Sequence, residues 1–223
     1  MKRRGLVIAI DGTVGTGKTT TARQVAERLG YRHLDTGAMY RAVALAATRR
    51  GVEPEDEDAL EDLLATSTID LDSARGRVLL DGQDISEAIR HPDITRRAGA
   101  YANVPLVRHS LVAQQQRLGQ WGGVVAEGRD IAAVVFPDAE LKIALVADLD
   151  ERARRRHREL TAKGVYITLE RVRSDIQTRD REDAVRDYGG TSAAAEIVEI
   201  DTTDMTLEDQ VDCVVALARQ RGA

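Results

Sequence analysis

The sequence predicts an α/β protein built on an open, mostly parallel β-sheet. Short runs at 6–11, 124–128 and 142–147 are apolar on both faces, as buried parallel strands are. Helical patterns separate these runs, and such alternation places the strands side by side with helical crossovers. With 223 residues, 43% of them hydrophobic, we expect a single domain over 1–223 with small excursions.

The first third of the chain alternates strands and helices. The pattern predicts, in order, a strand at 6–11, a helix at 18–29, a short strand at 31–34 and helices at 38–50 and 54–66. Gly30 and Gly51 directly follow two of these helices, as C-terminal glycines do. Pro54 is expected at the start of the helix over 54–66, with acidic residues in its first turn.

Residues 68–86, TIDLDSARGRVLLDGQDIS, interrupt this order. Polar and apolar residues alternate around Ala74-Arg75-Gly76, which predicts a small β-hairpin. Since hairpins do not belong to a strand-and-crossover pattern, we interpret this stretch as part of an inserted subdomain.

The rest of the chain returns to the first pattern. It predicts helices within 93–119 broken near Pro105, strands at 124–128 and 142–147, helices at 149–163 and 167–182, a strand at 196–201 and a last helix from Thr206 to about Arg221. Thr206, with Asp209 three residues later, resembles a capping box.

Composition narrows the class of protein. The apolar runs are far shorter than the ~20 residues of a membrane helix, and no secretory signal follows Met1, so we expect a cytoplasmic protein without a membrane partner. Cys213 is alone, which excludes an internal disulfide or a zinc cluster and favours the buried face of a helix. A net charge of −5 argues against general nucleic-acid binding. No exposed apolar helix face stands out, so we expect a monomer.

The stretch from Gly12 to Thr20, GTVGTGKTT, matches the phosphate-binding loop (P-loop) pattern and lies between a strand and a helix, as that pattern requires. Glycines allow consecutive backbone N–H groups to face a phosphate, and the helix N-terminus adds its dipole. Lys18, in a chain with lysine at only four positions, supplies a charge for the β- and γ-phosphates, and Thr19 supplies a hydroxyl for Mg²⁺. The stretch therefore predicts a site for ATP and Mg²⁺, formed by Gly12, Thr13, Val14, Gly15, Thr16, Gly17, Lys18, Thr19 and Thr20.

Three classes of protein use such a loop: small-molecule kinases, GTPase switches and ATPase subunits of larger machines. Guanine-specific GTPases typically carry Asn-Lys-x-Asp, but the chain has one asparagine, Asn103, and Val104 follows it. The ATPase class lacks its usual strand ending in paired acids, although Glu127 after a buried strand keeps that alternative open. We therefore favour a kinase.

Arginines at element ends support this choice, because phosphoryl transfer depends on positioning and charge neutralisation. Arg41 and Arg129 follow predicted strands, where ligands of open α/β sheets bind. In the basic helix at 149–163, Arg152, Arg155 and Arg156 lie on or near one face and could close over phosphates as a lid. Farther on, the residues Arg179, Asp183 and Arg186 share a face if their helix continues.

Six segments together resemble the cytidylate kinase family, over nearly the full chain: LDTGAMYRA, LLDGQDISEAIR, VPLVR, EGRDI with VVFPDA, ERARRRHREL and RDREDAVR. The resemblance implies a three-layer α/β/α P-loop kinase core, with a monophosphate-binding insert at about 36–105 and a short helical lid at about 150–165. It implies transfer of the γ-phosphoryl group of ATP to CMP or dCMP, with nucleotides as the partners. From spacing alone, the alternative is a kinase for another monophosphate, such as UMP or AMP, or for a small metabolite.

The resemblance also implies site residues. Thr36, Tyr40, Arg41, Arg129 and Arg186 would hold the CMP phosphate, Arg108 and Asp130 the cytosine edge, and Arg179 and Asp183 the ribose. Lys18, Arg129, Arg152, Arg155 and Arg156 would be catalytic. The chain departs from the family at Thr13-Val14, where Pro-Ser is common, and at Gly99, where relatives often place a serine against the base. We expect the missing hydroxyl at Gly99 to weaken discrimination between CMP and UMP by about 1 kcal/mol.

Overall fold

The computed structural model describes residues 5–73, 75–185 and 196–223, and the chain divides into two compact units. Unit 1 contains Met1–His33 and Gly122–Ala223, and unit 2 contains Leu34–Trp121. Unit 2 covers the residues of the insert expected at about 36–105; this insert, the single domain over 1–223 and the lid at about 150–165 stay predictions.

Unit 1 holds a parallel sheet in the order β2-β6-β1-β7-β8. Its strands are β1 (Val7–Gly12), β2 (Arg32–Asp35, which continues into unit 2), β6 (Val124–Gly128), β7 (Leu141–Val146) and β8 (Ile197–Asp201). β1 pairs in parallel with β6 and β7, and β7 pairs in parallel with β8. The fold class predicted from the doubly apolar runs is confirmed, since Ile8, Ala9 and Ile10, consecutive residues of β1 whose side chains alternate between the faces of the sheet, are all fully buried.

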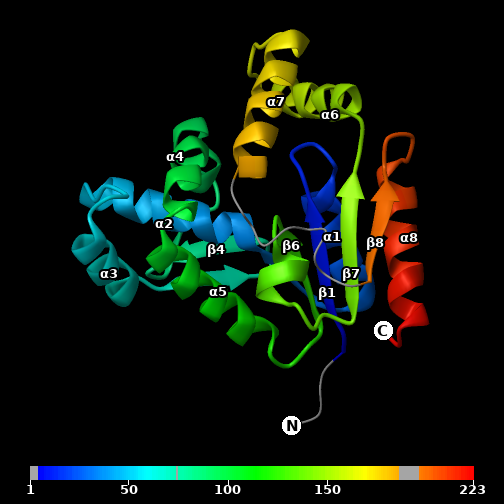
Figure 1. Ribbon diagram of the computed structural model, residues 1–223, viewed down its shortest axis with the longest axis horizontal. Helices are drawn as coiled ribbons and strands as arrows, with labels where there is room; N and C mark the ends of the chain where they lie inside the picture. Colours follow the sequence, from blue (N-terminus) through cyan, green and yellow to red (C-terminus); the bar gives the residue numbers. More distant parts are fainter. Residues whose placement is uncertain (1–4, 74, 186–195) are drawn as a thin grey trace. The chain divides into compact units, whose positions relative to one another are not determined.

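Helices pack on this sheet and beyond its carboxyl end. They are α1 (Lys18–Leu29), a π-helical turn (Ile131–Val135), α6 (Leu149–Ala162), α7 (Leu169–Val185) and α8 (Leu207–Gln220). α1 and α8 pack against each other and share one apolar core with the strands. α6 and α7 pack together around Ala153, Val172 and Ile176, and Figure 1 shows them beyond the arrowhead of β7. Helix α6 thus lies at the sheet edge where ligands of α/β proteins bind.

Unit 2 is mainly helical with a small antiparallel sheet. Its elements are α2 (Thr36–Arg50), α3 (Glu57–Thr66), β3 (Ile69–Asp72), β4 (Arg77–Leu80), β5 (Gln83–Asp84), a 3₁₀ turn (Ala88–Arg90), α4 (Pro92–Ala102) and α5 (Pro105–Gly119). The predicted hairpin is confirmed as β3–β4, and β5 adds a third strand. The fully buried Tyr101 ties α4 to the segment after α2, because its hydroxyl donates to the Val52 carbonyl oxygen at 2.6 Å.

Several expected boundaries move for identifiable reasons. Helix α2 begins at Thr36 rather than at residue 38, because the Asp35 carboxylate accepts the Ala38 N–H at 2.7 Å and caps the helix. Helix α3 begins at Glu57, after the Asp56 cap, so the expected start at Pro54 is wrong. Unit 2 continues past residue 105 because α5 packs on α2, α3 and α4.

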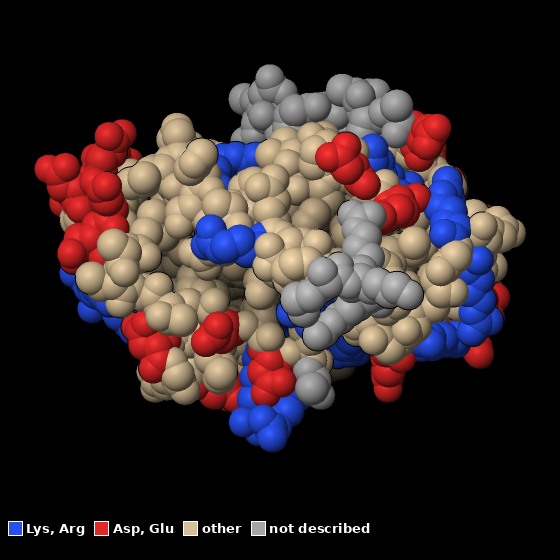
Figure 2. Space-filling view, turned by 90° about the horizontal axis from the view of Figure 1, so that it is seen from below, with Lys and Arg blue, Asp and Glu red and all other residues tan. Residues whose placement is uncertain are grey.

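Charge is unevenly spread over unit 2. Glu53, Glu55, Asp56, Glu57 and Asp58 line one hollow of its surface, around the start of α3. Figure 2 shows acidic side chains gathered on the part of unit 2 where α3 lies. In the described part of the chain, no helix combines the length and the apolar character needed to cross a membrane.

Candidate functional site

The loop between β1 and α1 has the backbone of a phosphate-binding turn. Gly15 and Gly17 have φ values of +84° and +92°, which side chains rarely adopt. Space is also restricted, since a Cβ at Gly17 would lie 2.8 Å from Gln210 Oε1. Gly17 is the N-cap of α1 and Lys18 its first residue, so the loop runs directly into the positive end of the helix dipole. The geometry suits an anion held by backbone amides.

Thr19 and Glu127 together form an oxygen pair beside this loop. The Thr19 hydroxyl donates to Glu127 Oε1 at 2.7 Å, and Glu127, at the end of β6, is only 2% exposed. Hydroxyl and carboxylate oxygens are ligands that Mg²⁺ accepts, either directly or through its waters. The pair therefore fits a magnesium ion bound next to a triphosphate.

Asp11, the residue before Gly12, connects β1 to the turn after β6. Its carboxylate accepts the backbone N–H groups of Ile131 and Ala132 at 2.8 and 3.1 Å. Burial raises the pKa of Asp11 from 3.8 to about 6. The two hydrogen bonds oppose this rise. The charge of Asp130 raises the pKa of Asp11 further, and that of Lys18 lowers it. The carboxylate fixes where the Arg129-Asp130 segment leaves the sheet.

Arg129 lies between the P-loop and α7. Its Nη1 donates to the Gly12 carbonyl oxygen at 2.5 Å, and its Nη2 lies 3.0 Å from Asp183 Oδ2. Both side chains are mostly buried, at 18% and 11% exposure. Asp130 is also buried, at 7% exposure. The structure therefore brings Arg129 and Asp183 together, two residues that the sequence assigned to phosphate and ribose.

Arg152 on α6 is in direct contact with the same loop. Its guanidinium forms a two-bond pair with Asp180 of α7, at 3.1 and 2.8 Å, and Nη1 also donates to Thr13 Oγ1 at 3.1 Å. Its Nε donates to the Ala147 carbonyl oxygen at 3.1 Å. The sequence predicts three lid arginines. Of these, Arg152 is buried, at 8% exposure, and Arg155 and Arg156 are partly exposed.

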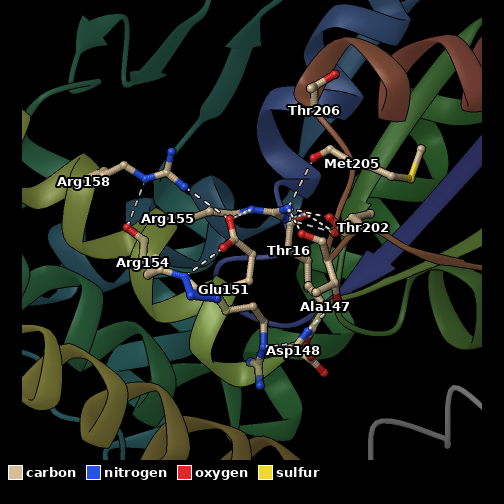
Figure 3. A network of polar contacts seen from close by, with 12 residues as sticks. Thr16, Ala147, Asp148, Glu151, Arg154, Arg155, Arg158, Thr202, Met205 and Thr206 are labelled. Atoms are coloured by element: carbon tan, nitrogen blue, oxygen red, sulfur yellow. Dashed lines mark hydrogen bonds and ion pairs between the residues drawn. The ribbon is translucent and has the colours of Figure 1, made fainter.

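Arg155 joins α6 to the P-loop and to the segment after β8, as Figure 3 shows. Its Nη1 donates to Thr202 Oγ1 at 3.1 Å and to the Thr16 carbonyl oxygen at 3.4 Å, and its Nη2 donates to the carbonyl oxygen of Thr202. Glu151, one turn earlier, accepts from Arg155 Nε at 3.0 Å and so fixes the side chain. Arg155 thus holds the 202–205 segment against the P-loop.

Arg156, one turn after Arg152, has a more exposed environment. Its Nη1 lies 2.6 Å from Glu159 Oε2, and the two side chains are 36% and 46% exposed. Because positions four apart on a helix share a face, Arg156 lies on the same face as Arg152. A carboxylate partner this exposed can be exchanged for a phosphate at little cost.

Unit 2 carries its own group of candidates. Asp35 caps α2 and pairs with Arg41, whose Nη2 lies 3.1 Å from Asp35 Oδ2. A Cβ at Gly37 would lie 3.0 Å from Arg41 Nη1, so glycine leaves room for this guanidinium. Thr36 is buried in the first turn and Tyr40 lies one turn later. The start of α2 therefore gathers three residues expected at the CMP phosphate.

The remaining candidates lie on three helices or outside the described residues. Gly99 lies in α4 and Arg108 in α5, both partly buried. Arg179 lies on α7 with Asp183, one turn apart. Arg186 lies outside the described residues.

Sequence reasoning gave no role to several residues that the structure places here. Asp11 is the last residue of the strand expected at 6–11, Asp180 lies in the helix expected at 167–182, and Glu127 enters only the ATPase alternative. Two signals were available: a polar residue closing an apolar strand, and an acid directly before Gly128-Arg129-Asp130. Nothing in the local sequence indicates that Thr202 meets Arg155, because 47 residues separate them.

The parallel sheet, the P-loop between its central strand and α1, and the arginines of α6 beside that loop define a P-loop kinase. A solved structure of an uncharacterized protein from Eubacterium ventriosum shares the fold, with a TM-score of 0.52, 12% identity and coverage of 97% of this chain and 99% of that one.

The comparisons with known proteins identify the family within that class. Residues 8–220 match the family model described as cytidylate kinase. A cytidylate kinase of Pelotomaculum thermopropionicum is 46% identical over 212 residues, covering 94% of each chain. A bifunctional pantoate ligase/cytidylate kinase of Synechococcus elongatus is 44% identical over all of this chain, which spans 44% of that longer protein. The chain belongs to the cytidylate kinase family.

Proposed function

We propose that this chain transfers the γ-phosphoryl group of ATP to CMP or dCMP, giving ADP and CDP or dCDP. The proposal rests on one observation in this member of the cytidylate kinase family: two arginines form hydrogen bonds to the start of the P-loop. Arg129 donates to Gly12, and Arg152 donates to Thr13. Cations so close to a phosphate-binding turn support phosphoryl transfer rather than simple nucleotide storage.

Residues 12–20 are proposed to hold the donor. The backbone amides of the loop and Lys18 would bind the phosphates of ATP. Thr19, supported by Glu127, would hold Mg²⁺, which when bound neutralises charge on the transferred group.

The acceptor is assigned to the residues that the family resemblance implies. We propose the CMP phosphate for Thr36, Tyr40, Arg41, Arg129 and Arg186, the cytosine edge for Gly99, Arg108 and Asp130, and the ribose for Arg179 and Asp183. The bidentate geometry of a guanidinium suits phosphate, and a carboxylate suits an amine or hydroxyl donor.

Transfer itself needs little acid-base chemistry. The attacking oxygen belongs to an anionic phosphate, so positioning and arginine charge suffice. We assign Arg156 to the transferred group, because its exposed pairing with Glu159 leaves it exchangeable. Arg152 and Arg155 would add their charge from the P-loop side, where their contacts hold them.

The alternative is a kinase of the same class for UMP, AMP or a small metabolite. Gly99 supports relaxed base choice, since it offers no hydroxyl to the base.

The test measures ADP formation from ATP and Mg²⁺ with CMP, dCMP, UMP, AMP and GMP as separate acceptors, against a blank without acceptor. We expect turnover with CMP and dCMP well above the rest. UMP turnover equal to that with CMP would favour the alternative, and ADP formation only in the blank would refute the kinase assignment.

Two variants test the assigned residues. Lys18→Ala should abolish turnover while circular dichroism shows an intact fold. Asp130→Ala should reduce the preference for CMP over UMP by about tenfold, as the loss of a charged hydrogen bond does, and Asp138→Ala, an exposed matched control, should not. An unchanged base preference in Asp130→Ala would contradict its role.

Since its substrates would be nucleotides, we propose a cytoplasmic enzyme, and we propose that it acts as a monomer. Light scattering during size-exclusion chromatography measures the second point directly.

A further inference from the structure

Two carboxylates of helix α7 pair with two arginines that contact the P-loop. Asp180 pairs with Arg152, and Asp183 pairs with Arg129. Arg129 donates to the Gly12 carbonyl oxygen and Arg152 to Thr13 Oγ1, so the two pairs reach consecutive residues of the loop. Residues three apart on a helix share a face, which explains why one helix supplies both carboxylates.

The Asp180–Arg152 pair is largely removed from solvent. The Arg152 side chain is 10% exposed and that of Asp180 27%. The other acceptors of the guanidinium are neutral: the carbonyl oxygens of Ala147 and Val14 and the hydroxyl of Thr13. Asp180 is therefore the one carboxylate among the described partners of this buried cation, and without it the charge loses its compensation.

Close packing transmits the position of Arg152 to the loop. A Cβ added to Gly15 would lie 2.8 Å from both Arg152 Cβ and its carbonyl oxygen. Real Cβ atoms do not approach so closely, so the loop backbone rests directly on α6 at this residue. A shift of α6 at Arg152 would therefore displace Gly15, and a shift of the Arg152 guanidinium would break its hydrogen bonds to Thr13 and Val14.

We infer that Asp180 is a positioning residue for the donor nucleotide: it holds Arg152 against the P-loop and so makes the geometry of the loop depend on helix α7. Helix α7 also carries Arg179 and Asp183. On the function proposed above, these residues contact the acceptor, so acceptor binding and donor binding stabilise the same arrangement of α7. Donor and acceptor then raise each other's affinity by an equal factor, as thermodynamic linkage requires.

The first measurement is the dissociation constant of a non-hydrolysable ATP analogue with Mg²⁺, by calorimetry, without acceptor. We expect Asp180→Asn to raise it about tenfold, because an amide cannot compensate the buried charge. Asp180→Glu, which restores the charge, should recover most of the affinity. Asp175→Asn on the same helix is the matched control, since Asp175 is half exposed and its ion pair within the described residues runs along α7, to Arg171.

The second measurement repeats the titration with saturating CMP. In the wild-type chain, CMP should lower the dissociation constant of the ATP analogue about fivefold or more, within the range of ordinary coupling between sites. In Asp180→Asn, most of this effect of CMP should be lost. In steady-state assays the KM for ATP should rise more than the KM for CMP. Purely structural damage would lower the melting temperature and would not raise the KM for ATP more than the KM for CMP.

An analogue dissociation constant that is the same in Asp180→Asn and Asp175→Asn would overturn the inference, as would equal weakening by Asp180→Asn and Asp180→Glu. The titration without acceptor needs no turnover, so it decides the role of Asp180 even if CMP proves not to be the acceptor. Failure of the acceptor panel refutes the proposed function and leaves this result standing.

Discussion

Asp11 offers a prediction whose size follows from its burial. Its carboxylate lies at the end of β1, 1% exposed, and accepts two backbone N–H groups from the turn at Ile131 and Ala132. Burial opposes ionisation more than these hydrogen bonds favour it, so the pKa rises from 3.8 to about 6 in the folded chain. The test replaces this carboxyl with an amide, in Asp11→Asn.

The sign follows from linkage between ionisation and folding. The folded chain holds the Asp11 proton more tightly than the unfolded chain, so the stabilisation is complete below pH 3.8 and is lost as the pH rises to about 6. At about 1.4 kcal/mol per pKa unit, the rise amounts to ~3 kcal/mol in total, of which about 2 kcal/mol falls between about pH 4 and about pH 7. Asn cannot ionise, so the variant lacks this loss.

Urea denaturation of the wild type and of Asp11→Asn between about pH 4 and about pH 7, followed by circular dichroism, measures how the free energy of unfolding depends on pH. The free energy of unfolding of the wild type, minus that of Asp11→Asn, should fall by about 2 kcal/mol from about pH 4 to about pH 7. Carboxylates far from Asp11 titrate alike in both chains, so their contributions cancel in the difference. Asp138→Asn, at an exposed position, is the control and should show no such fall. A difference between wild type and Asp11→Asn that stays flat with pH would refute the reasoning.

Three further predictions concern single contacts. Glu127→Gln keeps an acceptor for the Thr19 hydroxyl but removes the charge, so the Mg²⁺ concentration for half-maximal ADP formation should rise about tenfold or more; an unchanged Mg²⁺ dependence would contradict a metal role. Tyr101→Phe leaves the Val52 carbonyl oxygen without its donor and should lower the free energy of unfolding by about 1–2 kcal/mol in urea titrations, where no loss would show that water replaces the hydroxyl. Thr206→Ala removes the side-chain cap of α8 and should lower the free energy of unfolding by about 1 kcal/mol in the same measurement; a loss below a few tenths of a kcal/mol would mean that packing alone holds the helix.

The order of elements was predictable because it depends on local patterns. The doubly apolar strands, the glycine ends of α1 and α2 and the capping box at Thr206 all appear where the sequence places them. Boundaries that depend on side-chain caps were less predictable. Asp35 and Asp56 moved the starts of α2 and α3, because several nearby polar residues could have served as caps.

The candidate site was predictable in its residue types and only partly in its contacts. The spacing of the P-loop is itself a geometric requirement, so Lys18 and Thr19 follow from the sequence directly. The roles of the arginines do not. Arg152, Arg155 and Arg156 lie within five consecutive residues and look alike in sequence. Arg152 is buried and pairs with Asp180, Arg155 holds the segment after β8, and Arg156 stays near the surface.

A parallel α/β fold and a nucleotide-binding P-loop follow from the amino-acid sequence, and the motifs indicate the family. These properties depend on hydrophobic periodicity and on fixed spacings of a few residues, where the backbone sets which groups meet. The pairing of each carboxylate with its arginine is visible in the folded structure and not in the sequence. Asp180 lies 28 residues from Arg152 and Glu127 lies 108 from Thr19, and such pairs form only when separate elements pack against one another. The contacts beside the P-loop therefore depend on how α6, α7 and β6 are placed around it.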